Sequence, residues 1–97
     1  MSELNKVLRK NTLVVVDFHA SWCNPCKILA PKLEILCKEN NIILYKIDVD
    51  EFPDIASKFE IKSLPTILFF KDGEKIPNLK IVGAKLDKIK ETILKMK

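Results

Sequence analysis

The sequence predicts an α/β fold in which a mixed central sheet of about four strands is flanked by about four helices. Apolar, β-branched runs alternate with segments of helical period, which is the order of elements in a strand–helix–strand unit. The last two apolar runs are separated by Asp72-Gly73, a dipeptide typical of antiparallel hairpins. The 97 residues suffice for one hydrophobic core, so we expect a single domain over residues 1–97.

The first half of the chain predicts a short helix and then a strand–helix–strand unit. Residues 2–9 are expected to form a helix that Ser2 can cap and Asn11 can end. Residues 12–18 and 42–48 are predicted to be parallel strands, because a helix over residues 24–40 connects them. Both apolar runs are nearly continuous, which is typical of strands buried on both faces.

Two prolines mark the long connecting helix. Pro25 suits its first turn, where a missing N–H has no cost, and Pro31 is expected to kink it. The apolar side of this helix is formed by Leu29, Leu33, Leu36 and Cys37.

The second half of the chain predicts a short helix, a hairpin and a closing helix. The short helix covers residues 50–59, and strands over residues 66–70 and 75–82 are joined by a turn over residues 71–74. Pro77 inside the last strand requires an edge position or a bulge, because proline donates no hydrogen bond to a neighbouring strand. The closing helix carries apolar residues at helical spacing: Leu86, Ile89, Ile93 and Met96.

Composition limits the classes of partner and the compartment. The net charge is +4, but the lysines are scattered and not interleaved with aromatic residues, which indicates a solvated surface and not a nucleic-acid-binding one. The chain shows neither an apolar signal segment nor a run of membrane length. Three cysteines, two of them in one short motif, do not form a secreted disulfide scaffold. We therefore expect a cytoplasmic protein that binds neither nucleic acid nor membrane.

The chemistry is predicted at Cys23 and Cys26, where an apolar strand ends and the long helix begins. Unpaired N–H groups and the helix dipole favour a thiolate at Cys23, and the charge of Lys27 adds to this effect. Cys26 lies one turn further, so the two sulfurs can join in a disulfide. Cys23 is nearer the helix end and the exposed corner, so it should attack first and Cys26 should resolve the mixed disulfide.

Other interpretations of the cysteines are less well supported. A zinc site needs four ligands, and Cys23, Cys26, Cys37 and His19 have spacings that match no common pattern, so no metal is predicted. A purely structural disulfide across two residues would stabilise little. For Cys37 we favour a buried inert thiol over a regulatory one, and for His19 packing beside the motif over titration near it.

Several motifs resemble the thioredoxin family in order and, except in the last interval, in spacing. From about Leu13 to the C-terminus they are Val16-Asp17-Phe18, Trp22-Cys23-Asn24-Pro25-Cys26-Lys27, Pro31, Lys46-Ile47-Asp48, Leu64-Pro65-Thr66, Lys71-Asp72-Gly73 and Val82-Gly83-Ala84. The resemblance implies a thioredoxin fold whose first family strand is short or absent. The last interval is about two residues long for the family, and Pro77-Asn78 suggests a bulge that absorbs them.

The resemblance implies a role for each matched position near the cysteines. Cys23 would be the nucleophile and Cys26 the resolving cysteine. Asp17 would be a buried carboxylate beneath Cys26 that assists proton transfer, with Lys46 beside it. The residues alone agree for Asp17, because burial in an apolar strand raises the pKa of a carboxyl group. The alternatives are an Asp17 that faces solvent at a strand end and a Lys46 that is a surface lysine.

The resemblance also implies a docking surface for an extended client segment. Pro65 would follow a cis peptide bond and stand opposite the cysteines, and the backbone of Leu64 would pair with the client. Trp22, Gly83 and Ala84 would complete an apolar rim.

Asn24 and Pro25 lie between the cysteines, where the family's residues tune the reduction potential. Asn24 replaces the usual glycine, and neither the size nor the sign of its effect follows from the sequence.

The function implied is that of a protein-disulfide reductase, an electron carrier in cell redox homeostasis. It would hold no tightly bound cofactor and would receive electrons from NADPH through thioredoxin reductase. Its clients would be disulfide-containing proteins such as peroxiredoxins or ribonucleotide reductase, and it would be a monomer. Two alternatives remain at this point, a disulfide oxidase or isomerase of the same fold and a non-catalytic binding subunit.

Overall fold

The structure, a computed structural model, describes residues 2–97, with side chains from Glu3 onward, so the predicted cap by the Ser2 side chain lies outside the described part. Four helices and four strands are found there. In chain order they are α1 (Ser2–Lys10), β1 (Leu13–His19), α2 (Asn24–Glu39), β2 (Ile43–Asp48), α3 (Pro53–Lys58), β3 (Thr66–Lys71), β4 (Glu74–Val82) and α4 (Leu86–Met96).

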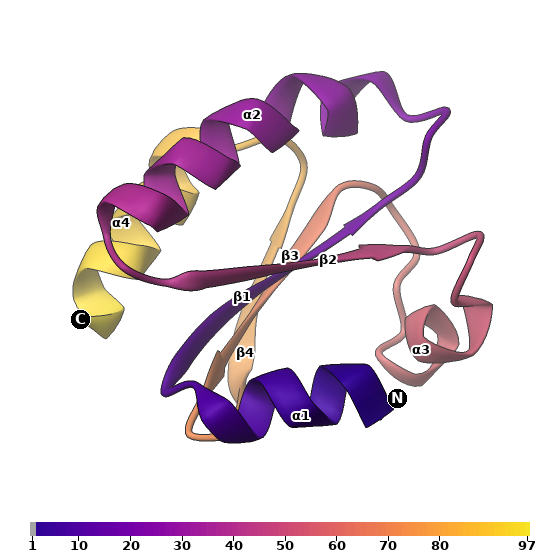
Figure 1. Cartoon of the computed structure of the whole chain (residues 1–97). Helices are drawn as coiled ribbons and strands as arrows, with labels where there is room; N and C mark the ends of the chain where they lie inside the picture. The colour runs from indigo at the N-terminus through magenta and orange to yellow at the C-terminus, as the bar shows by residue number, and fades with distance from the viewer. Residues whose placement is uncertain (1) are drawn as a thin grey trace.

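The four strands form one mixed sheet in the order β2-β1-β3-β4. Strand β1 pairs with β2 in parallel and with β3 antiparallel, and β3 pairs with β4 antiparallel. Helices α2 and α4 cover one face of the sheet, and α1 and α3 lie on the other (Figure 1). The predicted α/β architecture is therefore confirmed.

Strand β1 lies between two cores, which explains its continuous apolar run. Val15 belongs to the core beneath α2 and α4. Val14, Val16 and Phe18 belong to the core beneath α1 and α3. Successive side chains of a strand point to opposite faces, so a strand covered on both sides needs apolar residues at every position. Asp17, on the α2 side, is the exception.

Strand β2 corrects the prediction of a second strand buried on both faces. It is an edge strand, and Ile43 is exposed, whereas Ile47 is buried. The apolar run of residues 42–47 shows that the segment packs on the sheet, but it does not show that a further strand lies beyond it. No described strand pairs with the outer edge of β2.

Helix α3 is shorter than predicted. It begins at Pro53, with Phe52 as the preceding N-cap residue, and ends at Lys58. Proline is favoured in the first turn and disfavoured further inside a helix, so the start at Pro53 follows from proline's own geometry. Residues 50–51 form a turn instead of the helix's first residues.

The β3–β4 hairpin has the predicted turn and the predicted bulge. Asp72 and Gly73 both have positive φ, 53° and 87°, as a two-residue hairpin turn of the favoured twist requires. The pairing register shifts between Leu68 and Phe70, opposite the β4 segment that contains Pro77 and Asn78. Because β4 is also an edge strand, the missing N–H of Pro77 disrupts no inner strand pair.

The long helix α2 continues through Pro31 and buries one face. Its buried residues are Cys26, Leu29, Leu33, Leu36 and Cys37. No helix within residues 2–97 has the length and apolar character needed to cross a bilayer.

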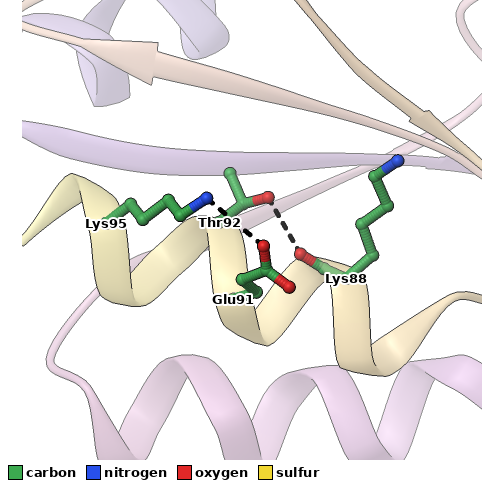
Figure 2. A network of polar contacts seen from close by, with 4 residues as sticks. All are labelled: Lys88, Glu91, Thr92 and Lys95. Atoms are coloured by element: carbon green, nitrogen blue, oxygen red, sulfur yellow. Dashed lines mark hydrogen bonds and ion pairs between the residues drawn. The ribbon is translucent and has the colours of Figure 1, made fainter.

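Helix α4 is amphipathic. Ile89 and Ile93 are buried, and its outer side carries the polar contacts in Figure 2. Thr92 Oγ1 donates to the Lys88 carbonyl at 2.8 Å, and Lys95 Nζ lies 3.3 Å from Glu91 Oε1. Such exposed pairs contribute little, so burial of the apolar side holds this helix in place.

We predict that Leu33→Ala lowers the free energy of unfolding by about 2–5 kcal/mol, because it leaves a cavity at a fully buried position. Ile35→Ala on the same helix is the matched control. Ile35 is 59% exposed, so the change should stay within about 0.5 kcal/mol. Urea unfolding of both variants measures the difference, and equal losses would contradict the described orientation of α2.

Candidate active site

The site forms where β1 ends and α2 begins, because a tight loop of residues 20–23 joins the two elements. Cys23 is the N-cap residue of α2, with extended backbone angles. Its Sγ accepts a hydrogen bond from the N–H of Cys26 at 3.4 Å, and its carbonyl accepts one from the N–H of Lys27. The first turn of the helix thus directs a backbone donor at this sulfur, which favours negative charge there.

Cys23 and Cys26 are joined in a disulfide, with their Cα atoms 5.3 Å apart. They are 5% and 3% exposed and pack with Ala20, Val49 and Leu64. The prediction that Cys23 lies at an exposed corner is not supported, because Cys23 is nearly as buried as Cys26. The cap position, and not exposure, distinguishes the two cysteines.

Asp17 is 1% exposed, so the interpretation of a solvent-facing carboxylate is wrong. Its Oδ1 is buried and has no hydrogen-bond partner among the described residues. Burial raises the pKa of Asp17 from 3.8 to about 6, and the positive charges of His19 and Lys46 oppose part of that rise. The carboxyl group therefore gains and loses a proton near neutral pH.

Lys46 lies beside Asp17 in the parallel β1–β2 pair. Its ammonium group contacts Glu34 Oε1 of α2 at 2.8 Å. Lys46 therefore affects Asp17 electrostatically and not through a hydrogen bond. The negative charge of Glu34 has the opposite effect and raises the pKa of Asp17.

A small cavity of about 120 Å³ connects these groups. It is lined by Asp17, His19, Ala20, Ser21, Cys26, Lys27, Ala30 and Lys46. The lining includes the buried Asp17 and Cys26 as well as the exposed Ser21 and Lys27, so the cavity leads from the surface to the carboxyl group. Its walls are mostly apolar, and the Asp17 carboxyl group is one of the few polar groups that could hold a water molecule there.

Of the docking residues predicted in the second half of the chain, Leu64 contacts the cysteine cluster, and Pro65 follows it directly. The Leu64–Pro65 peptide bond is cis, as predicted. Leu64 packs against the cysteine cluster, and the N–H of Gly83 donates to the Pro65 carbonyl at 2.8 Å. Gly83 has a φ of 100°, which strains any residue with a side chain, and Ala84 beside it is exposed.

Trp22 is exposed, and its indole N–H donates to Asp50 Oδ2 at 2.8 Å. Sequence reasoning did not identify Asp50, because the contact joins residues 28 positions apart and no motif marks it. Asp50 is itself placed by a hydrogen bond from its backbone N–H to Asp48 Oδ1.

Asn24 and Pro25, the residues between the cysteines, are the first two residues of α2, and both are exposed. Cys37 is buried in the core beneath α2 and α4. Burial, and then the charge of Asp17, raise the pKa of the Cys37 thiol to about 11. Among the described residues, no group of three or more His, Cys, Asp or Glu side chains is placed to hold a metal ion.

A cysteine pair at a strand–helix junction, with a cis proline nearby and a buried carboxylate below, defines a dithiol–disulfide exchange site. Comparisons with known proteins agree. The model of the family named Thioredoxin matches residues 1–95. Thioredoxin-1 of Saccharomyces cerevisiae is 43% identical over 93 residues, which cover 95% of this chain and 88% of the relative.

Solved structures are similar over nearly the whole chain. The X-ray structure of Fasciola hepatica thioredoxin has a TM-score of 0.92 at 39% identity, covering 99% of this chain and 93% of the other. A structure from work on the thiol resolving mechanism in yeast mitochondrial 1-Cys peroxiredoxin via glutathione/thioredoxin systems has a TM-score of 0.89 at 35% identity, covering 98% and 89%.

The chain belongs to the thioredoxin family. It has the thioredoxin fold and is a thiol–disulfide oxidoreductase, a protein-disulfide reductase whose redox pair is Cys23 and Cys26. Neither the oxidase or isomerase nor the non-catalytic subunit is favoured by these comparisons.

We predict that Asp17→Asn changes the pH dependence of stability. The pKa of Asp17 is higher in the folded than in the unfolded chain, so its contribution is complete below pH 3.8 and is lost as the pH rises through about 6. The difference between the two pKa values corresponds to roughly 3 kcal/mol in the free energy of unfolding.

Urea unfolding of Asp17→Asn and the unchanged protein at pH 4 and pH 7 measures this effect. The asparagine amide also changes the free energy of unfolding, by an amount that does not depend on pH. The relevant quantity is therefore the free energy of unfolding of the variant minus that of the unchanged protein, taken at pH 7 and compared with its value at pH 4. It should favour the variant by up to about 3 kcal/mol. A value near zero would show that ionisation of Asp17 does not destabilise the folded protein.

Proposed function

We propose that Cys23 is the attacking cysteine and Cys26 the resolving cysteine of this reductase. The observation that carries the assignment is the cap geometry, in which the N–H of Cys26 donates to the Cys23 sulfur at the start of α2. A thiolate at that position is stabilised by the helix, and the thiolate is the form that attacks a disulfide.

The reaction then runs in two exchanges. The Cys23 thiolate attacks one sulfur of a client disulfide, and the other client sulfur leaves as a thiolate. The Cys26 thiol gives its proton to Asp17 through the cavity and attacks the Cys23 sulfur. The Cys23–Cys26 bond forms, and the client's second sulfur leaves as a thiolate. Two electrons pass from the cysteine pair to the client, whose thiolates take protons from solvent.

Asp17 and Lys46 support the second exchange. The raised pKa of Asp17 makes the carboxylate a usable base near neutral pH. His19 and then Lys46 limit this rise electrostatically, which keeps part of the carboxyl population ionised. Asn24 and Pro25 are the positions at which the reduction potential is tuned.

The client would dock beside the disulfide as an extended segment. The backbone of Leu64 would pair with it, as in strand addition, and Trp22, Pro65, Gly83 and Ala84 would form the rim around it. The packing of Leu64 on the cysteine cluster and the hydrogen bond between Gly83 and Pro65 support this arrangement.

The partners are proposed from the family and from the chain's charge. Clients are disulfide-containing proteins such as peroxiredoxins or ribonucleotide reductase. The similar structure from work on a yeast mitochondrial 1-Cys peroxiredoxin supports the first of these classes. NADPH would supply electrons through thioredoxin reductase, with no cofactor held tightly by this chain. We further propose a monomeric single domain in the cytoplasm that serves electron transport and redox homeostasis and binds neither nucleic acid nor membrane.

We predict that Cys26→Ser accumulates a covalent adduct with a client disulfide, because the first exchange proceeds and the second lacks its nucleophile. Cys23→Ser should form no such adduct and should lose insulin reduction. Non-reducing electrophoresis with oxidised insulin measures both.

Cys37→Ala is the matched control for these variants, because it removes a buried thiol outside the pair and should leave both reactions unchanged. Retention of insulin reduction by Cys23→Ser would reverse the assignment of the two cysteines.

A further inference from the structure

The second exchange leaves a proton on a buried group. Once Asp17 has taken the proton of Cys26, it either releases that proton to solvent or returns it to the Cys26 thiolate when the disulfide is reduced again. Asp17 is almost completely buried, and within the described part of the chain its Oδ1 has no hydrogen-bond partner. A proton-accepting group between the carboxyl oxygen and solvent would speed the release to solvent.

The walls of the cavity offer few such groups. Lys27 and Lys46 end in ammonium groups, which have no lone pair to accept a proton, and Lys46 is also paired with Glu34. The Ser21 hydroxyl ionises only far above neutral pH. His19 remains, and an imidazole both accepts and donates a proton near neutral pH.

The position of His19 fits this task. It follows Asp17 by two residues on β1, so both side chains point to the α2 face of the sheet. Asp17 is buried and His19 is half-buried at the end of the strand, so the pair spans the distance from the interior toward solvent.

We propose that His19 relays protons between Asp17 and solvent, and so controls the rate at which the resolving exchange can be repeated. This rests on the proposed roles of Cys26 and Asp17. The Asp17 carboxylic acid gives its proton to the neutral imidazole, directly or through water in the cavity. The imidazolium then releases a proton to solvent. No electrons move in this step, and the chain ends with an ionised Asp17 and a neutral His19.

Other charged groups surround the relay and belong to its electrostatics. Asp48 lies opposite His19 in the β1–β2 register, and Lys46 lies opposite Asp17. From α2, Lys27 and Cys26 line the same cavity, and Glu34 pairs with Lys46. These groups set how readily each proton moves, but none of them replaces an imidazole that accepts and releases it near pH 7.

The test is steady-state reduction of oxidised insulin by His19→Ala, with and without free imidazole. The variant should lower kcat at pH 7 by about tenfold or more and leave KM nearly unchanged, because docking does not involve His19. Imidazole should restore kcat in proportion to the concentration of its neutral form, so rescue should increase from pH 6 to pH 8. A merely structural role would give no such rescue.

His19→Gln keeps a polar side chain and guards against a folding defect. It should be as slow as His19→Ala but not respond to imidazole, because the glutamine fills the space. Ser21→Ala is the matched control, since it lines the same cavity without a titratable group and should behave as the unchanged protein.

Combining His19→Ala with Asp17→Asn distinguishes the proposed relay from the proposed role of Asp17, on which the relay rests. If Asp17→Asn is slow and His19→Ala adds no further loss, both proposals stand. If Asp17→Asn is slow but His19→Ala is as fast as the unchanged protein, or slow without rescue, the relay is overturned and Asp17 keeps its role. If Asp17→Asn is fully active, the role of Asp17 itself is wrong.

Discussion

The burial of one carboxyl group in the central strand is the constraint on which the site depends. An apolar residue at position 17 would complete the core beneath α2 at no desolvation cost. Asp17 instead opposes packing, because its charge is favoured only in a wetter environment. The cavity lined by Asp17, Cys26 and Lys46 supplies part of that environment. The residue that suits catalysis at this position is therefore not the one that suits packing. The two cores on either side of β1 compensate for the stability lost by burying the carboxyl group.

Much of this arrangement follows from the sequence because it is local. The Cys23 cap, the Asp72-Gly73 turn and the bulge near Pro77 are decided by residues within a few positions of one another. The burial of Asp17 was predictable for the same reason, since apolar neighbours on both sides imply a covered strand.

Features that depend on distant segments were not predictable. The hydrogen bond between Trp22 and Asp50 and the ion pair between Glu34 and Lys46 join different elements, and no periodicity marks them. The exposure of Ile43 has a similar cause. An apolar run predicts a strand, but whether that strand lies inside the sheet or at its edge depends on how many other strands are present.

Cys37 shows how a chain can contain a third cysteine in addition to a reactive pair without interfering with it. With a pKa near 11, only about one in ten thousand of these thiols is ionised at pH 7. Because exchange proceeds through the thiolate, Cys37 enters a wrong disulfide very rarely. Thiol–disulfide exchange is therefore confined to Cys23 and Cys26. Alkylating reagents should therefore modify Cys23 fast and Cys37 very slowly in the reduced protein.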